Sequence, residues 1–153
     1  MRKSLSSQFY QDGIVYGTGV VASRLQHTVS MNNLSFIIVD DNVAYRYILR
    51  QIVQTQPQWS IVVEASNGLE ATRLVAQYAP DVVLMDVSMP LMNGIEATRQ
   101  IKQTAPNTRV IIFSGYKDEE LRRESLQAGA DYYLLKEDLD TNSLTQLITM
   151  LFP

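Results

Sequence analysis

Residues 81–94 constrain the fold of this 153-residue chain more than any other segment. Residues 81–85 form a short, β-branched, apolar run with no polar alternation, which predicts a strand buried on both faces. Asp86 follows this strand directly, and residues 89–90 (Met-Pro) and 93–94 (Asn-Gly) have the composition of turns. Open α/β sheets place their functional groups at the carboxyl ends of such strands, so we expect Asp86 to lie in a functional site.

The same strand-then-helix pattern recurs along the chain. Apolar runs at 34–39, 59–65, 109–113 and 132–135 predict four more strands, and a segment with helical periodicity follows each of them. Five βα units in succession predict an α/β fold, a doubly wound parallel sheet with helices on both faces. Right-handed crossovers favour the flavodoxin-like strand order 2-1-3-4-5. We therefore expect residues 34–153 to form one domain.

Cap-forming residues indicate where the helices begin and end. Asn67 precedes the second expected helix, and Asp118 suits the positive N-terminus of the fourth. Gly129 can end that fourth helix, and Thr141 or Asn142 can cap the last one.

The composition excludes several classes of protein. The chain has no cysteine, which excludes disulfide scaffolds, zinc–thiolate sites and cysteine nucleophiles and permits a cytoplasmic location. After residue 33 the chain holds fifteen acidic and ten basic side chains, so we expect no direct nucleic-acid binding by this domain. No apolar run reaches the roughly 18–20 residues that a membrane span requires. We expect a soluble, cytoplasmic domain.

Residues 1–33 differ from the rest of the chain. Residues 1–30 lack sustained periodicity and mix Ser, Gln, Gly and Thr, so we expect residues 1–33 to form a flexible N-terminal extension or tag and residues 1–30 to be dispensable for folding. Met31 can serve as the natural start, and a targeting peptide is the alternative interpretation. His27, the only histidine, lies here, and a solvated tail residue is favoured over a phosphodonor or a metal ligand.

Polar residues end four of the predicted strands and converge in the expected strand order. Asp40 and Asp41 end the first strand, Asp86 the third, and Ser114 and Lys136 the fourth and fifth. Three neighbouring carboxylates repel one another, and Mg²⁺ is the hard divalent cation that best neutralises them beside a phosphoryl group. Asp86 can then act as a nucleophile toward phosphorus, while the ammonium and hydroxyl groups bind phosphoryl oxygens.

These residues carry a resemblance to a known family. Residues 34–152 resemble the receiver domain of response regulators in two-component signalling. The shared landmarks, in order, are Val39-Asp40-Asp41-Asn42, residues 85–94 (MDVSMPLMNG), Ser114-Gly115, residues 128–133 (AGADYY) and Lys136. Glu137-Asp138 replaces the proline that commonly follows the lysine, a variant resembling receivers of the nitrate-regulator type that drive helix-turn-helix outputs. Because the sequence ends after the fifth expected helix, it is either a stand-alone receiver or a fragment of a longer regulator.

The resemblance implies a role for each site residue. It makes Asp86 the phosphoacceptor, which receives a phosphoryl group from a histidine kinase or histidine phosphotransfer protein. It implies that Asp41, Asp86 and the Ser88 backbone carbonyl bind Mg²⁺, and that Asp40 contributes through water. Lys136 would contact the phosphoryl group, and Ser114 would bond to it after modification.

The resemblance also implies a route from the site to a partner. Tyr133 would be the aromatic switch, and the fourth helix, fifth strand and fifth helix would present the surface for an output partner. We further expect Tyr116 and Ser88 to tune the lifetime of the phosphorylated state, because they flank the approach of water: a bulky ring obstructs it, whereas a small serine leaves its side open. The domain would be a phosphoacceptor rather than a conventional enzyme.

Two other functions and a set of purely structural roles remain open at this stage. A Mg²⁺-dependent phosphatase also passes through an aspartyl phosphate, but it would need a second acid at the position that Ser88 occupies. A degenerate receiver could serve only as a binding scaffold. Taken singly, the two acids at 40–41 can cap a helix, Asp86 can form a turn, and Ser114, Lys136 and Tyr133 can be loop, surface and core residues.

Overall fold

The computed structural model describes residues 33–153, and these form an α/β domain around one parallel sheet. The expectations for residues 1–32, including those for Met31 and His27, lie outside the described residues. The strands are β1 (Ser35–Val39), β2 (Ser60–Ala65), β3 (Val82–Asp86), β4 (Arg109–Ser114) and β5 (Tyr132–Leu135). The helices are α3 (Val43–Gln54), α4 (Gly68–Tyr78), α5 (Gly94–Thr104), α6 (Glu119–Gln127), the 3₁₀ turn η1 (Lys136–Asp138) and α7 (Thr141–Leu151).

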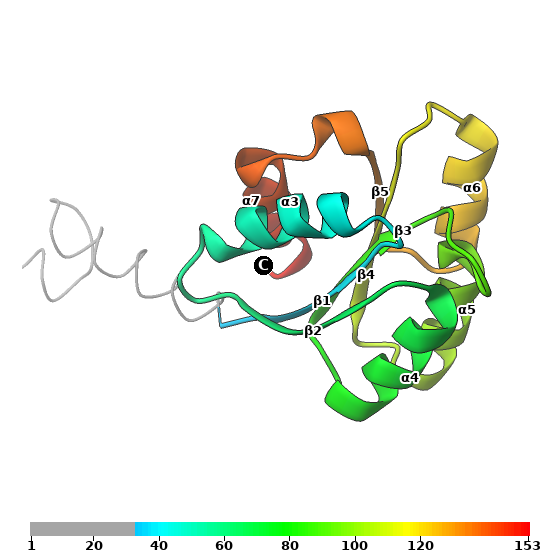
Figure 1. Cartoon of the computed structure of the whole chain (residues 1–153), viewed down its shortest axis with the longest axis horizontal. Helices are drawn as coiled ribbons and strands as arrows, with labels where there is room; N and C mark the ends of the chain where they lie inside the picture. Colours follow the sequence, from blue (N-terminus) through cyan, green and yellow to red (C-terminus); the bar gives the residue numbers. More distant parts are fainter. Residues whose placement is uncertain (1–32) are drawn as a thin grey trace, which may run out of the picture. The chain divides into compact units, whose positions relative to one another are not determined.

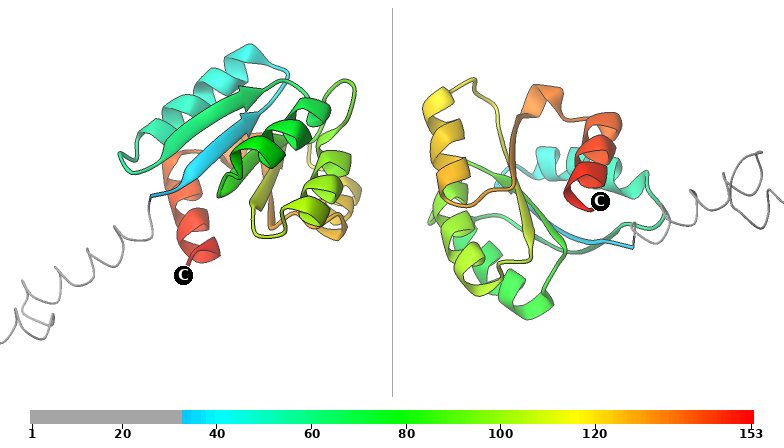
Figure 2. Two further views of the ribbon diagram at one scale, coloured as in Figure 1. Left: turned by 90° about the horizontal axis from the view of Figure 1, so that it is seen from below. Right: turned by 180° about the vertical axis from the view of Figure 1, so that it is seen from behind.

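The strand order is β2-β1-β3-β4-β5, and every pairing is parallel, which confirms the predicted flavodoxin-like topology. Helices α3 and α7 cover one face of the sheet, and α4, α5 and α6 cover the other (Figures 1 and 2). Within residues 33–153, no helix combines the length and the apolar character needed to cross a membrane.

Two hydrophobic cores follow from the alternation of side chains along the strands. Ile37 and Met85 face the core under α4 and α5, whereas Phe36, Ile38 and Leu84 face the core under α3 and α7. All five residues are fully buried, as expected for central strands that are covered on both faces. This double burial holds β1 and β3 rigidly side by side, so the residues that follow them have fixed positions.

The caps agree with the sequence at most helix ends. Asn67 and Asp118 accept hydrogen bonds from backbone N–H groups in the first turns of α4 and α6. Gly129 follows α6 with φ of 108°, a left-handed conformation that favours glycine. The prediction for the last helix is wrong: Asp140, rather than Thr141 or Asn142, caps α7 in a capping box with Ser143.

Candidate functional site

The polar strand ends meet at the carboxyl edge of the sheet in one pocket of about 390 Å³. This pocket contains every sequence-predicted site residue except Tyr133. It is lined by Asp40, Asp41, Asn42, Asp86, Val87, Ser88, Ser114, Gly115, Tyr116 and Lys136. The convergence that the sequence predicted from topology is therefore present in the structure.

Three carboxylates form the acidic part of the pocket. One oxygen from each of Asp40, Asp41 and Asp86 lies within 4.8 Å of the others. Asp40 is fully buried and Asp86 is 5% exposed, whereas Asp41 faces solvent. Burial, together with the negative charge of Asp40, raises the pKa of the Asp86 carboxyl to about 6, although Lys136 opposes this shift. Asp86 is thus mostly ionised at neutral pH, but it is held among like charges.

Lys136 supplies a positive charge among the residues that line the pocket. Its Nζ atom lies 2.9 Å from Asp40 Oδ2 and 3.4 Å from Asp86 Oδ1. One ammonium group cannot balance three carboxylates, so the site keeps an excess of negative charge. Clustered carboxylate oxygens with such an excess fit Mg²⁺, which prefers oxygen ligands and keeps several of its waters. The donor set of this pocket therefore fits the predicted cation.

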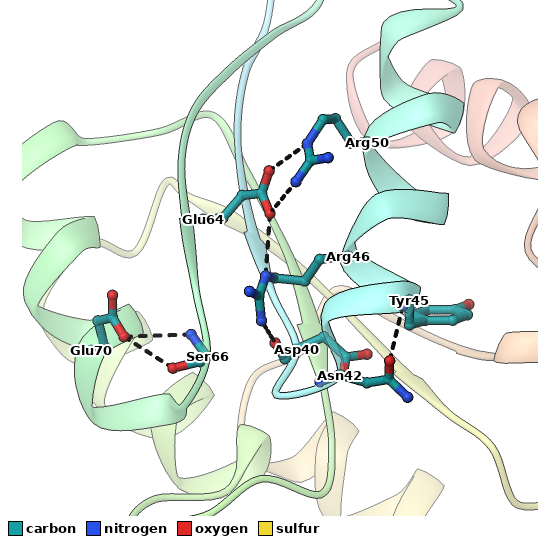
Figure 3. Close-up of polar contacts among 8 residues, drawn as sticks. All are labelled: Asp40, Asn42, Tyr45, Arg46, Arg50, Glu64, Ser66 and Glu70. Carbon is teal, nitrogen blue, oxygen red and sulfur yellow. Dashed lines mark hydrogen bonds and ion pairs between the residues drawn. The ribbon is translucent and has the colours of Figure 1, made fainter.

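Asp40 is held in place by its neighbours on α3 and β2 (Figure 3). Its Oδ1 atom accepts a hydrogen bond from the Asn42 backbone N–H, and its carbonyl oxygen accepts one from Arg46 Nη1 at 2.6 Å. Arg46 Nε also donates to Glu64 on β2, which accepts two further bonds from Arg50 at 2.7 and 2.9 Å. These bonds, chiefly those from Arg50, lower the pKa of Glu64. We call Arg46, Arg50 and Glu64 the arginine clasp.

The loop after Asp86 is positioned by a close backbone approach. A Cβ atom added at Gly94 would lie 2.1 Å from the Asp86 carbonyl oxygen, which only glycine avoids. The Gly94 N–H donates to the Val87 carbonyl at 2.9 Å. The sequence interpretation of residues 93–94 as a turn is incomplete, because Asn93 is the N-cap of α5 and Gly94 is its first residue. Ser88 projects from this loop as an exposed residue.

Hydrogen bonds connect Ser114, which lines the pocket, to Tyr116 and then to Tyr133. The Ser114 hydroxyl, which is fully buried, accepts a hydrogen bond from the Tyr116 backbone N–H at 3.1 Å. The Tyr116 carbonyl in turn accepts a bond from the Tyr133 hydroxyl at 3.4 Å. The side chain of Tyr116 is 72% exposed, and Tyr133 lines a second groove of about 650 Å³ beside α6 and β5. Tyr133 therefore connects the loop at the pocket to this second groove.

Sequence reasoning missed the functional environment of Lys136 and Asp40. The Tyr45 ring centroid lies 4.2 Å from Lys136 Nζ, although the two residues are 91 positions apart in the sequence. The sequence does contain a pattern that points to the arginine clasp. Arg46 and Arg50 are four residues apart on one helix face, and Glu64 lies in the next strand. That signal becomes specific only once β1 and β2 are known to be paired.

Comparison with known proteins identifies the family. Residues 36–149 match the family model described as the response regulator receiver domain. The chain belongs to this family. The transcriptional regulatory protein DegU of Brevibacillus brevis is 35% identical over 124 residues, which cover 81% of this chain and 52% of that protein. The chain thus spans about half the length of the first transcriptional regulators that it matches.

Shorter relatives match over most of their length. The chemotaxis protein CheY of Halobacterium salinarum is 38% identical over 100 residues, which cover 65% of this chain and 82% of that protein. A crystal structure of the CheX–CheY–BeF₃–Mg²⁺ complex from Borrelia burgdorferi matches with a TM-score of 0.72 and 30% identity, covering 78% of this chain and 90% of that one. This receiver domain is therefore a component of two-component signalling, in which phosphorylation controls the state of the receiver.

Proposed function

We propose that this receiver accepts a phosphoryl group on Asp86 from a histidine kinase or histidine phosphotransfer protein. The observation that carries the proposal is the convergence of three carboxylates and Lys136 in one pocket at the carboxyl edge of the sheet. Among the carboxylates, Asp86 is the one that ends the central strand β3 and heads the loop to Ser88. An oxygen of Asp86 forms a bond to phosphorus as the bond from phosphorus to the donor nitrogen breaks. The nitrogen leaves with the electron pair.

The acidic residues would bind the cation that neutralises the charge of the phosphoryl group. Asp41, Asp86 and the Ser88 carbonyl would hold Mg²⁺, and Asp40 would contribute through water. When bound, Mg²⁺ supplies positive charge that screens the incoming phosphoryl oxygens from the carboxylates. Asp41 suits direct contact because it faces solvent, whereas the buried Asp40 already bonds to Lys136 and to the Asn42 backbone.

Lys136 and Ser114 would bind the phosphoryl group from the other side. The Lys136 ammonium lies 3.4 Å from an Asp86 oxygen, within easy reach of a group attached there. Ser114 lines the same pocket, and its hydroxyl can donate its hydrogen to a phosphoryl oxygen. Charge-assisted bonds of this kind stabilise the charge that builds up on the equatorial oxygens.

The phosphorylated state would be transmitted through the chain of bonds from Ser114 to Tyr133. Movement of Ser114 toward the phosphoryl group would pull on the backbone of Tyr116, whose carbonyl accepts the Tyr133 hydroxyl bond. Tyr133 would then turn inward and change the surface of α6, β5 and α7, where we place the output partner. The cytoplasm is the compartment that this role requires.

Intact-mass measurement with acetyl phosphate tests the phosphoacceptor. We expect the gain of one phosphoryl group in the presence of Mg²⁺, none with Asp86→Asn, and slower labelling with Asp41→Ala. A phosphoryl group gained by Asp86→Asn contradicts the assignment. Steady turnover of a small phosphoester such as p-nitrophenyl phosphate would favour a phosphatase instead.

A second experiment tests the switch. Tyr133→Ala should accept the phosphoryl group at the parental rate, because Tyr133 does not line the pocket. Its affinity for a partner should change less than about threefold on phosphorylation, whereas coupling in the parent should fall in the usual range of about 5–150-fold. A variant with parental coupling shows that the signal travels by another route.

A further inference from the structure

Lys136 rests on an aromatic surface that the roles described so far do not use. Its Nζ atom lies 4.2 Å from the centroid of the Tyr45 ring and 5.6 Å from that of Phe113. The two rings pack against each other with their centroids 5.5 Å apart and their planes tilted by 44°. The ammonium thus lies close both to the carboxylates of Asp40 and Asp86 and to two electron-rich aromatic rings.

The position of Tyr45 is set independently of Lys136. Tyr45 lies in the first turn of α3, where its backbone N–H donates to the Asn42 side chain that caps the helix. Its half-buried ring also joins the core beneath α3. Because the helix cap and the core hold the ring, it can restrain the flexible lysine rather than follow it.

The ring, rather than the hydroxyl group, makes the important contact. The Tyr45 hydroxyl donates to the Lys136 carbonyl at 3.5 Å, which is long for a hydrogen bond between these atoms. Burial and the charges of Asp40 and Asp86 raise the pKa of this hydroxyl, so it stays protonated and adds no negative charge of its own. The aromatic face therefore supplies the attraction.

We propose that Tyr45 is a positioning residue for phosphoryl transfer, because its ring holds the Lys136 ammonium over the pocket. An unrestrained lysine would spread over many rotamers and into solvent, and it would lose part of its contact with the phosphoryl oxygens. The inference rests on the proposed function, because it assigns Lys136 to the phosphoryl group. A cation–π contact of this kind corresponds to about a 2–30-fold change in rate.

The test compares variants that keep or remove the ring. Tyr45→Phe should be phosphorylated by acetyl phosphate at nearly the parental rate, whereas Tyr45→Leu and Tyr45→Met should be about 2–30-fold slower. Tyr47→Leu is the matched control, because Tyr47 lies on the same helix, is 56% exposed and has its ring near Arg50 instead. Equal rates in all five proteins, the parent included, would overturn the proposal.

A double-mutant cycle separates positioning from a general structural role. If Tyr45 acts through Lys136, Tyr45→Leu should have no further effect on the residual rate of Lys136→Met. An undiminished effect in that background shows that the ring acts by other means. All rates are compared at temperatures where each variant is folded, as judged by thermal unfolding.

A readout without phosphate distinguishes this proposal from the phosphoacceptor assignment. Loss of the ring should raise the rate at which an acetylating reagent modifies Lys136, measured by peptide mass spectrometry, whereas Tyr45→Phe and Tyr47→Leu should not. If Asp86 is not the phosphoacceptor, Asp86→Asn still gains the phosphoryl group while the lysine labelling keeps this pattern. If the ring does not hold Lys136, labelling is unchanged in Tyr45→Leu although Asp86→Asn fails to gain the phosphoryl group.

Discussion

Asp131 and Asp86 are acidic residues at opposite edges of the same sheet, and their surroundings differ in one respect. Asp131, at the amino edge, accepts bonds from Lys102 Nζ at 2.6 Å, from Arg109 Nη1 at 3.1 Å and from the Val110 N–H at 2.8 Å. Asp86, at the carboxyl edge, has Lys136 at 3.4 Å and two further carboxylates close by. One carboxylate has more than enough positive partners, and the other has too few.

This difference is the basis on which we assign Asp131 a structural role and Asp86 the proposed functional role. A partly buried carboxylate that is fully paired, such as Asp131, holds the segments around it together and needs no further ligand. A buried carboxylate among other carboxylates destabilises the folded chain until a cation arrives, and it stays available as a nucleophile. The predictions below test this contrast in decreasing order of expected effect.

The largest effect is expected from removing the structural acid. Asp131→Ala removes the carboxylate that accepts bonds from Lys102, Arg109 and the Val110 N–H, and Lys102 keeps its bond to the Thr108 carbonyl. The loss should lower the free energy of unfolding by about 2–4 kcal/mol. Urea unfolding followed by the fluorescence of Trp59, the only tryptophan, measures this loss. Phosphorylation of the folded variant should proceed as in the parent. A change below about 0.5 kcal/mol would show that the pairing at this edge has little structural value.

Removing the charge of Asp86 should change the free energy of unfolding in the opposite direction. The folded-state pKa of Asp86 is raised from 3.8 to about 6, so its contribution to stability is fully present below pH 3.8 and is lost as the pH rises through about 6. Asp86→Asn avoids this loss, so at pH 7 it should be more stable than the parent by about 1–3 kcal/mol. The gain should shrink to near zero by about pH 4.

Magnesium provides the control for that prediction. Millimolar Mg²⁺ should stabilise the parent more than Asp86→Asn, because a ligand stabilises the folded state by RT ln(1 + [L]/Kd) and the variant lacks one of the carboxylate ligands. The difference between the two proteins at pH 7 should therefore narrow on addition of Mg²⁺. A variant that is less stable than the parent throughout pH 4–7 would contradict the charge argument.

The fold could be read from the sequence because each of its signals is local and is repeated five times. The α7 cap was misassigned because Asp140, Thr141 and Asn142 are consecutive cap-forming residues, and local chemistry does not rank them. Tyr45 could not be assigned to Lys136, since the two are 91 residues apart and their contact depends on side-chain placement across the sheet. Local sequence patterns thus predicted where the carboxylates lie, but they did not identify the residues that hold the site in position, such as Tyr45 and Arg46.

The arginine clasp allows a sharper test of what holds the functional edge. Arg46 and Arg50 both bind Glu64, but only Arg46 among them also bonds to the Asp40 carbonyl. If that bond fixes the acidic loop, Arg46→Met should weaken Mg²⁺ binding about tenfold, as loss of a supporting partner typically does. Arg50→Met should weaken it far less. Calorimetric titration with Mg²⁺ provides both affinities, and equal losses would mean that the clasp acts only by fastening α3 to β2.

The smallest effect is expected at the mouth of the pocket, in the lifetime of the phosphorylated state. Tyr116 and Ser88 both line the pocket. Within residues 33–153 the Tyr116 backbone is bonded to Ser114 and to Tyr133, whereas its side chain makes no hydrogen bond. Hydrolysis needs a water molecule in line behind phosphorus, and a large ring near that path excludes water for part of the time. Because the ring is 72% exposed, it can obstruct the path without sealing it.

Tyr116→Ala should therefore shorten the phosphorylated half-life by only about 2–5-fold, which corresponds to less than about 1 kcal/mol in the barrier to hydrolysis. The phosphorylation site and the Mg²⁺ requirement should stay unchanged. Within residues 33–153, the Tyr116 side chain makes no hydrogen bond to the carboxylates or to Lys136. Tyr78→Ala is the control, because Tyr78 is an exposed tyrosine at the end of α4 that does not line the pocket. Loss of the phosphoryl group is followed by intact mass after the phosphodonor is removed. A half-life equal to or longer than that of the parent removes Tyr116 from the mechanism. The rate of hydrolysis would then be set by the access of water past the small side chain of Ser88.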